Sequence, residues 1–263
     1  VFTCSDGSFL FPPDLAFLQP LLLATGHLDI AKSWVEYFAE RIEGMRSYTK
    51  RIFGAEGVFC PWAVPYAGFA GFHEPTPPTK NYYSIHNSGY LARMAEETGA
   101  FVDDPAWTER NVLPILRETA RFYRSICTRE DDGLWHLFVT PSTGQDENGG
   151  FNQKDYLCAL YSAQYCFQKA IAYGLDRDGD YASILRDGLA FPALLTDRGF
   201  YYSNLGAKNE NAGGQKHPVQ LNELAFLPVH TVPSPSAVTA YKKRYDITIN
   251  ASLPHFAGWT VGE

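Results

Sequence analysis

Two adjacent acids, Asp146 and Glu147, stand in the stretch TPSTGQDENGGFNQKDY, which spans residues 140–156. The stretch is rich in turn-forming residues, and an apolar helical pattern follows it directly. A general acid that works at neutral pH needs a carboxyl group whose pKa is raised, either by burial or by a neighbouring acid. Neighbouring side chains point apart, so we expect one acid to face a pocket while Asp146, or Asn152 nearer the helix, caps that helix. Composition alone favours a different interpretation, a solvated acidic turn.

The elements around this stretch form pairs of helices separated by long loops. The first pair is an αα-hairpin with a short connection, and the unit of helix, helix and long loop recurs at roughly 70 residues. Loops this long inside a compact domain are usually functional. Helices are expected over residues 12–26, 29–54, 81–99, 105–127, 152–174 and 179–195, with weaker ones near 218–228 and 235–245, and short strands over 133–140 and 199–204.

The composition limits the function classes. Apolar residues make up 45% of the 263 and charged residues 19%, which predicts a packed globular core. The formal net charge of -7, with no basic run, argues against nucleic acid and against an anionic membrane surface as partners. The longest apolar stretch, residues 15–24, is broken by Gln19 and Pro20 and is too short to span a bilayer.

The cysteines predict neither a disulfide framework nor a metal site. Cys158 and Cys166 lie on one expected helix, about 12 Å apart along its axis, which is too far to bridge. The five cysteines contain no CxxC and no zinc spacing with histidine. The glycosylation triplet at Asn250 gives a weak preference for a secreted or extracytoplasmic protein. Because the chain starts with Val1, we expect either a removed leader or an internal cut.

The segment HLFVTPSTGQDEN, residues 136–148, resembles the general-acid segment of glycoside hydrolase family 95, the inverting α-L-fucosidases. That family has a short strand followed by Pro-Ser-Thr-Ser-Pro-Glu-Asn. Residues 141–143 match the Pro-Ser-Thr, and Glu147 with Asn148 matches the Glu-Asn. Residues 144–146 replace the Ser-Pro, so one extra residue must be accommodated. The Asp-Glu pair also resembles, more distantly, the Gly-Pro-Asp-Glu-Tyr motif of family 65.

Other segments extend the resemblance over most of the chain. Residues 2–22 resemble the substrate-binding segment near the first helix in these families, with Asp6 as the counterpart of the acid or amide found there. Residues 54–62, GAEGVFCPW, are similar to the family-65 Gly-Ala-x-Phe-Pro-Trp loop. Residues 81–99 resemble the next barrel helix, whose N-terminal residues face the sugar. Residues 253–263 resemble the family-95 Gly-Trp-Ser segment.

The resemblance implies an all-α fold, an (α/α)6 barrel of αα-hairpins with short β segments in its long loops. The active site of such a barrel lies in the loops at one end. We expect residues 1–263 to form a single (α/α)-barrel catalytic domain that belongs to a longer polypeptide. Only about four of the six hairpins are expected here, so the barrel would be completed by the remainder of the polypeptide or by a second chain.

The implied chemistry is inverting glycoside hydrolysis without a metal or other cofactor. Glu147 would be the general acid, and a second group would activate water across the sugar, with Glu263 as one candidate. Trp62 would stack on a sugar face. Ordinary packing and capping roles are the alternatives for every binding residue. The other candidate substrate-binding residues are Asp6, His86, Asn87, Trp135 and Gln153.

The expected substrate is a carbohydrate, either an α-L-fucoside, an α-galactoside or an α-glucoside. Two other functions stay open at this point. A glycoside phosphorylase of the same fold would use phosphate in place of the activated water. A carbohydrate-binding or structural (α/α) protein would lack catalysis altogether.

Overall fold

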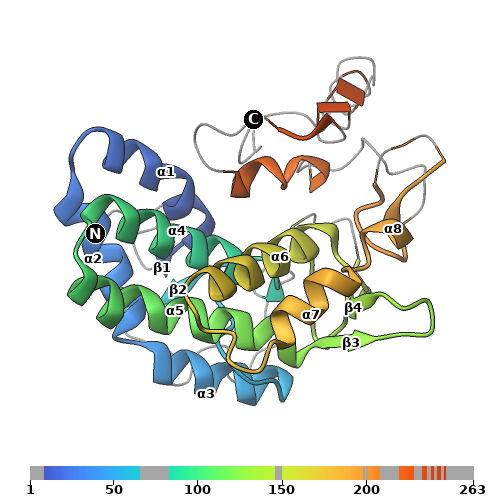
Figure 1. Ribbon diagram of the computed structural model, residues 1–263, viewed down its shortest axis with the longest axis horizontal. Coiled ribbons are helices and arrows are strands. Elements are labelled where there is room, and N and C mark those ends of the chain that lie inside the picture. The colour runs from blue at the N-terminus through green and yellow to red at the C-terminus, as the bar shows by residue number, and fades with distance from the viewer. Residues whose placement is uncertain are drawn as a thin grey trace.

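The computed structural model describes residues 9–65, 83–145, 150–197, 199, 201–207 and 219–227, with a few separate residues beyond them (233–235, 238–239, 242–243 and 246). Three helix pairs make up most of this part of the chain (Figure 1). The helices are α1 Pro12–Ala24, α2 Leu28–Ala39, α3 Ile42–Phe53, α4 Asn87–Val102, α5 Pro105–Ser125, α6 Leu157–Ala172, α7 Asp180–Asp187 and α8 Phe191–Leu194. The strands are β1 Phe9–Leu10, β2 Val64–Pro65, β3 Cys127–Arg129 and β4 Trp135–Leu137.

Helices α1, α4 and α6 form an inner layer, and α2, α5 and α7 pack outside them. Most residues of α4 and α6 are buried, as expected for helices with neighbours on nearly all sides. Near its start, α4 accepts a hydrogen bond at the His86 carbonyl from Ser162 of α6 (2.8 Å). Further along, Glu96 of α4 pairs with Lys169 of α6. Both pairs advance along the chain in the same direction, so the two inner helices are parallel.

Each outer helix runs back against its inner partner. The Tyr123 hydroxyl, near the end of α5, donates to the Ile85 carbonyl just before α4 (2.8 Å). Conversely, Gly99 near the end of α4 lies against Val112 early in α5. The outer layer is itself connected, since the Trp107 indole of α5 donates to Glu36 of α2 (2.7 Å). The expected αα-hairpins are therefore present.

The helix ends follow local sequence signals. Pro12 and Pro13 occupy the first turn of α1, where their missing N–H groups have no helical partner to lose. Asp104 caps α5 by accepting from the backbone N–H groups of Ala106 and Trp107 (3.0 and 3.1 Å). Gly54 ends α3 with φ of 66°, a conformation that glycine adopts without steric cost.

Two of the expected helices are each divided in two. The helix expected over 179–195 is α7 and α8, separated by residues 188–190, where Gly188 has φ of 101°. The pattern over residues 29–54 predicts a single helix, but the chain bends at Glu40 and Arg41 between α2 and α3. The bend redirects the second half of the segment. Trp34 and Phe38 of α2 join the core beside α4 and α5, while Tyr48 of α3 stacks on Phe59 at a centroid distance of 6.1 Å.

The segment near 218–228 is also shorter than expected. It forms two 3₁₀ turns, η4 Val219–Leu221 and η5 Leu224–Phe226. Pro228 disfavours helical backbone at the residue before it, and Leu227 is extended (φ −79°, ψ 139°). The turns are held by aromatic packing, since the Phe226 ring stacks on Tyr90 of α4 at 5.4 Å. The expected helix over 235–245 lies mostly outside the described residues.

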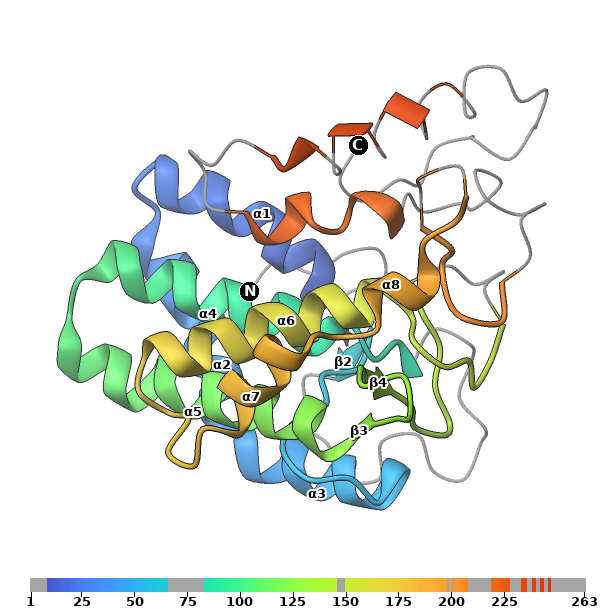
Figure 2. The ribbon, with the colours of Figure 1, turned by 45° about the vertical axis from the view of Figure 1, so that its right-hand side comes forward.

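The strands form two short antiparallel ribbons, β1 with β2 and β3 with β4. The strand expected over 133–140 is β4, and Tyr201 within 199–204 forms an isolated bridge to Leu195. Both ribbons lie at the end of the molecule where the inner helices begin (Figure 2). The long connections return there, because each runs from the end of an outer helix to the start of an inner one.

Candidate active site

The stretch 140–156, here called the acid loop, is closed at its base by a pair of hydrogen bonds. The Ser142 N–H donates to the Asn152 side chain (2.9 Å), and the Asn152 N–H donates to the Ser142 carbonyl (2.8 Å). Thr143 and Phe151 form an antiparallel bridge one step further in. Asn152 therefore serves the loop and does not cap α6, whose N-cap is Tyr156, without a side-chain hydrogen bond.

The acid loop is anchored to the segment that leads into α4. The Thr143 N–H donates to the Tyr83 carbonyl (2.9 Å), and the Ile85 N–H donates to the Thr143 carbonyl (3.1 Å). Thr143 also forms a parallel bridge with Ser84. The loop thus runs beside the N-terminal end of an inner helix, which is the end where the resemblance places the site.

Tyr156 contacts both arms of the acid loop. Its hydroxyl donates to the Gly150 carbonyl (2.7 Å) and accepts from the Gln153 N–H (3.0 Å). Gly144 lies flat against the Tyr156 ring, where an added Cβ would come within 2.5 Å of Cδ1. The glycine at position 144 is therefore required by close packing, and the two arms of the loop are fixed on one aromatic side chain.

Three of the predicted site residues lie outside the described part of the chain: Asp6, Glu147 and Glu263. Asp146, the neighbour of Glu147, does too. The residue before them, Gln145, is buried, and its side-chain oxygen accepts from Asn222 (2.9 Å). Asn222 also donates to the Tyr90 hydroxyl of α4 (2.9 Å). One amide group thus joins the acid loop, the inner helix α4 and the 219–227 segment.

His86, Asn87 and Trp62 come together at the start of α4. The His86 ring lies 6.4 Å from the Trp62 ring and 5.6 Å from Tyr90, centroid to centroid. Asn87 is fully buried, and in the described part of the chain neither atom of its side-chain amide has a hydrogen-bond partner. An unpaired buried amide is costly and is retained where it has a role. Asn87 thus has the donor and acceptor that a sugar hydroxyl needs.

Trp62 is carried by a segment that is pinned to three helices. The backbone N–H of Phe59 donates to Thr49 of α3 (2.8 Å), and that of Cys60 donates to Ser88 of α4 (3.0 Å). Val58 donates to the Glu118 carbonyl of α5 (2.8 Å). The indole of Trp62 remains half-buried, so one part of its ring is open to a ligand.

The other two described candidates lie apart from this group. The Gln153 side chain turns back on its own loop, donating to the Phe151 carbonyl (2.8 Å) and lying against Gly206. Trp135 faces the outer helices, where its indole donates to Asp187 of α7 (3.3 Å) and Arg124 of α5 lies over its ring at 5.4 Å. The structure brings His86, Asn87 and Trp62 together, but not Trp135.

A buried histidine–carboxylate cluster lies at the C-terminal arm of the loop. His136 Nδ1 lies 2.6 Å from Asp155 Oδ2, and Nε2 lies 3.0 Å from Asp132 Oδ2. Burial lowers the pKa of His136, but the hydrogen bond and charge of Asp155 and the bond to Asp132 outweigh it and raise the pKa overall. Burial raises the pKa of Asp155, opposed by its bonds from His136 and the Leu137 N–H.

Asp155 was missed as a functional residue because its side chain meets His136 only after β4 and the turn before α6 have come together. Its position directly before an apolar helical pattern suggests an N-cap instead.

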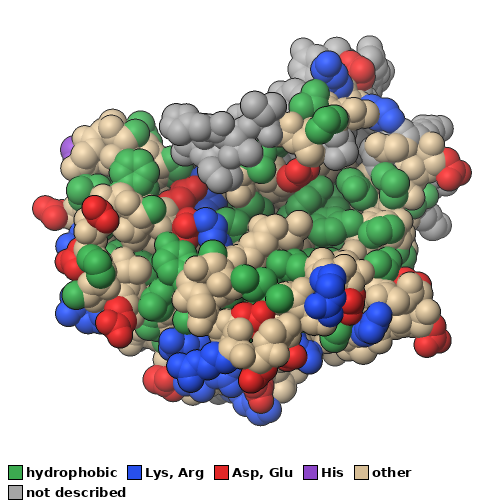
Figure 3. Space-filling view, viewed as in Figure 1, with side chains coloured by type: hydrophobic (Ala, Val, Ile, Leu, Met, Phe, Trp, Pro, Cys, Tyr) green, Lys and Arg blue, Asp and Glu red, His purple; other side chains and the backbone are tan. Residues whose placement is uncertain are grey.

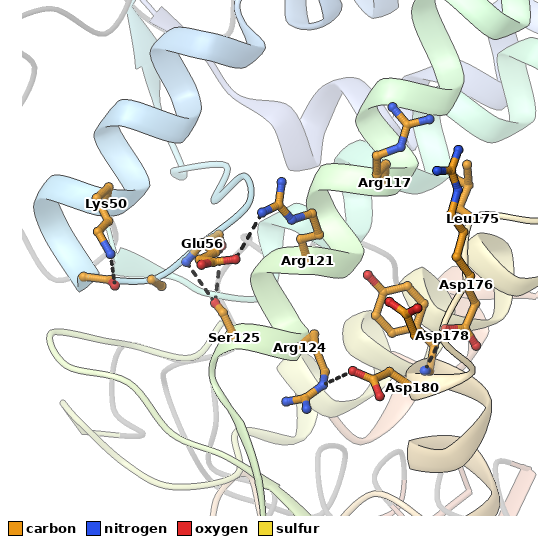
Figure 4. Close-up of a pocket in the computed structure, with 14 residues that line it drawn as sticks. Lys50, Glu56, Arg117, Arg121, Arg124, Ser125, Leu175, Asp176, Asp178 and Asp180 are labelled. Carbon is orange, nitrogen blue, oxygen red and sulfur yellow. Dashed lines mark hydrogen bonds and ion pairs between the residues drawn. The ribbon is translucent and has the colours of Figure 1, made fainter.

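A polar hollow of about 940 Å³ lies elsewhere, along the outer helices α5 and α7 (Figure 4). Two ion pairs lie within it, Arg121 with Glu56 and Arg124 with Asp180, both at 3.1 Å. It is a solvated ionic surface rather than a second candidate site. Within the described ranges, no three His, Cys, Asp or Glu side chains are grouped to hold a metal ion. None of the described helices is long and apolar enough to cross a membrane.

No protein-family model matches the chain. The described helix pairs, with the parallel inner helices α4 and α6, have the (α/α)6-barrel architecture of glycoside hydrolases and phosphorylases. The solved structure titled "Putative kojibiose phosphorylase from human microbiome" matches with a TM-score of 0.60 and 13% identity, over 91% of this chain and 35% of that one.

A sequence relationship accompanies the shared fold. The chain is 26% identical over 220 residues to a kojibiose hydrolase of Flavobacterium johnsoniae, a match that covers 82% of this chain. It spans about a third of the length of these relatives, 31% of the hydrolase and 35% of the solved structure. The chain is thus similar in sequence to a kojibiose hydrolase and in fold to the structure named as a kojibiose phosphorylase, and neither comparison shows family 95 in particular.

Proposed function

We propose that this chain carries one half of the active site of an inverting glycoside hydrolase that acts on α-glucosides, with Glu147 as the general acid. The carrying observation is the attachment of the acid loop beside the N-terminal end of α4, through Thr143 and through Gln145. That attachment holds Thr143, four residues before Glu147 in the sequence, against Ile85, which directly precedes His86 and Asn87. The relative that matches in sequence is named as a hydrolase of kojibiose, an α-linked glucose disaccharide, which favours α-glucosides over the fucosides and galactosides.

In the proposed reaction Glu147 protonates the glycosidic oxygen while a second carboxylate activates water on the opposite face of the sugar. An inverting pair is separated by about 6.5–9.5 Å, which leaves room for that water. Asn87 offers both a donor and an acceptor to a sugar hydroxyl. Trp62 offers an aromatic face against which a sugar ring packs.

We further propose that the barrel is completed by residues beyond those described. An apolar hollow of about 530 Å³ is lined by all three inner helices together with Phe226 and Leu227. Leu21 of α1 and Phe101 of α4 are 61% and 52% exposed at this place. On the face drawn in Figure 3, hydrophobic side chains also gather near α6 and α8. Burying such surface is favourable by about 25 cal/mol per Å², so further inner helices of a six-hairpin barrel would be stabilised there.

The test is the hydrolysis of kojibiose by the full-length protein and by two matched variants. We expect Glu147→Gln to lower kcat about 10²- to 10⁴-fold, the usual contribution of a general acid. Asp146→Asn, which removes the neighbouring charge, should retain most activity. If Asp146→Asn abolishes turnover while Glu147→Gln does not, the assignment of the acid is wrong.

A phosphorylase is the alternative that the shared fold favours, because the solved structure is titled as one. The two reactions differ in their co-substrate. Release of glucose 1-phosphate only when phosphate is supplied would replace hydrolysis by phosphorolysis. Binding of kojibiose without turnover, with or without phosphate, would contradict both and leave a binding protein.

A further inference from the structure

We propose that His136 is a positioning residue for the general acid, acting as a charged clamp between Asp155 and Asp132 that fixes the C-terminal arm of the acid loop. The inference rests on the proposed function, since it concerns the loop that carries Glu147. Its basis is the geometry of the cluster, in which a buried ring bridges β4, the β3–β4 turn and the residue two positions before α6.

The contacts of the ring determine its protonation state. Both ring nitrogens face carboxylate oxygens, at 2.6 Å for Asp155 and 3.0 Å for Asp132. An ionised carboxylate only accepts hydrogen bonds, so two such bonds require N–H on both ring nitrogens. The other charged groups that face the ring are Glu130, at 3.9 Å from Nε2, and Lys154, which pairs with Glu130. Carboxylates predominate around His136, which favours the imidazolium.

Asp155 is tied to β4 at three points. Its Oδ2 accepts from His136, its Oδ1 accepts from the Leu137 N–H (2.8 Å), and its own N–H donates to the Leu137 carbonyl (3.0 Å). These bonds hold Asp155 at φ of 56°, a left-handed conformation that is uncommon outside glycine and that aspartate adopts more readily than most residues. Without the bonds from its side chain, the backbone here would lose the contacts that keep it in this conformation.

The next residue transmits this constraint to the tip of the loop. Tyr156 follows Asp155 directly, and its hydroxyl holds Gly150 and Gln153 at 2.7 and 3.0 Å. Gly150 is the first described residue after the segment that contains Glu147. The contacts from His136 to Asp155, Tyr156 and Gly150 are therefore continuous, and we infer that a shift of Asp155 reaches Gly150, three residues after Glu147 in the sequence.

The experiment exploits a property of general acids. The leaving oxygen of a disaccharide must be protonated. A 2,4-dinitrophenyl α-glucoside releases 2,4-dinitrophenolate, which is stable without protonation and needs no general acid. A misplaced acid therefore lowers kcat on kojibiose much more than on the aryl glucoside. A general loss of folding lowers both rates equally. The ratio of the two kcat values is thus a readout that a merely structural role would not move.

Two substitutions of His136 separate its two contacts. The amide nitrogen of asparagine can take the place of Nδ1, so His136→Asn keeps a donor for Asp155. The amide of glutamine takes the place of Nε2, so His136→Gln keeps a donor only for Asp132. We expect His136→Gln to lower kcat on kojibiose about 10- to 100-fold, the scale of a displaced catalytic group, with a much smaller effect on the aryl glucoside. His136→Asn should restore most of the loss.

The ratio of the two kcat values is measured for Glu147→Gln together with the two His136 variants, so that each proposal can fail separately. If Glu147→Gln does not change the ratio of the two rates, the proposed function fails. If Glu147→Gln changes the ratio but His136→Gln lowers both rates alike or neither, the positioning role is overturned while the proposed function stands. Equal losses in His136→Asn and His136→Gln would also overturn it. Should His136→Gln fail to fold, Asp155→Asn, which weakens the same contact, takes its place in the comparison.

Discussion

Gly89 in the first turn of α4 lies directly against Ser162 of α6. A Cβ at Gly89 would come within 2.4 Å of the Ser162 Cβ and 2.8 Å of its Cα. Neither atom can move by a change of rotamer, so a larger residue would push the two inner helices apart. Because His86 and Asn87 lie only three and two residues before Gly89, this contact also sets where they sit relative to α6.

We expect Gly89→Ala to destabilise the fold by about 1–3 kcal/mol, the usual cost of overpacking a core. Urea unfolding gives the value. The matched control is Gly44→Ala in α3, where the glycine is exposed and alanine should stabilise the helix by roughly 0.5–1 kcal/mol. A Gly89→Ala variant as stable as the original protein would show that α4 and α6 separate easily.

The unpaired amide of Asn87 predicts opposite effects on stability and function. Asn87→Leu keeps a similar volume and removes a buried polar group that lacks partners, so stability should rise by about 1–3 kcal/mol. Hydrolysis of kojibiose should fall, because the sugar loses a ligand. Thermal unfolding and the KM measured on one preparation test both effects together.

The control for that prediction is Asn222→Leu. The Asn222 amide donates to Gln145 and Tyr90, so the same substitution should destabilise. If Asn87→Leu destabilises as much as Asn222→Leu, the Asn87 side chain supports the fold and not a ligand.

Tyr156→Phe tests the support of the acid loop. The change removes the hydroxyl that donates to Gly150 and accepts from Gln153, and we expect a loss of about 1–3 kcal/mol together with reduced hydrolysis. Circular dichroism during urea unfolding measures the first effect, and kojibiose turnover the second. Tyr181→Phe is the control, because that tyrosine stacks on Phe167 in the outer part of the fold. A loss of stability with full activity would separate Tyr156 from the site.

The raised pKa of His136 predicts how stability depends on pH. A folded-state pKa above the unfolded value adds stability that is fully present below about pH 6.5, the unfolded pKa. That stability is lost as the pH rises through the folded pKa. The free energy of unfolding of the unsubstituted protein should therefore exceed that of the His136→Asn variant. The difference should be largest in mildly acidic buffer and should shrink as the pH rises. A difference that grows with pH would mean that the histidine is neutral in the folded protein.

Local patterns were enough to predict where α1, α4, α5 and α6 occur, but not the breaks within the segments 29–54 and 179–195. The expected start of α1 at residue 12 and the end of α3 at Gly54 match the structure, because prolines and glycines act within one turn of where they stand. The bend between α2 and α3 was not predictable in this way. It depends on packing against Phe59 and α5, and the helical pattern of the sequence continues through it.

The same distinction between local patterns and long-range contacts applies to the candidate site. His86, Asn87 and Trp62 belong to motifs that a family resemblance could mark, and the structure brings them together. The contacts of Asn222 with Gln145 join residues 77 positions apart, and those of Asp155 with His136 depend on a turn meeting a strand. No spacing in the sequence encodes such pairs. Asp6, Glu147 and Glu263 stay predictions, because they lie outside the described residues.

The paired hydrogen bonds between Ser142 and Asn152 have a consequence for how this site can vary among relatives. Since both arms of the acid loop are fixed below the tip, a residue inserted between them lengthens only the tip and leaves the register of α6 unchanged. The extra residue that separates this loop from the family-95 pattern lies between those arms. A change in the length of the tip would thus alter the proposed site around Glu147 while α4 and α6 keep their places.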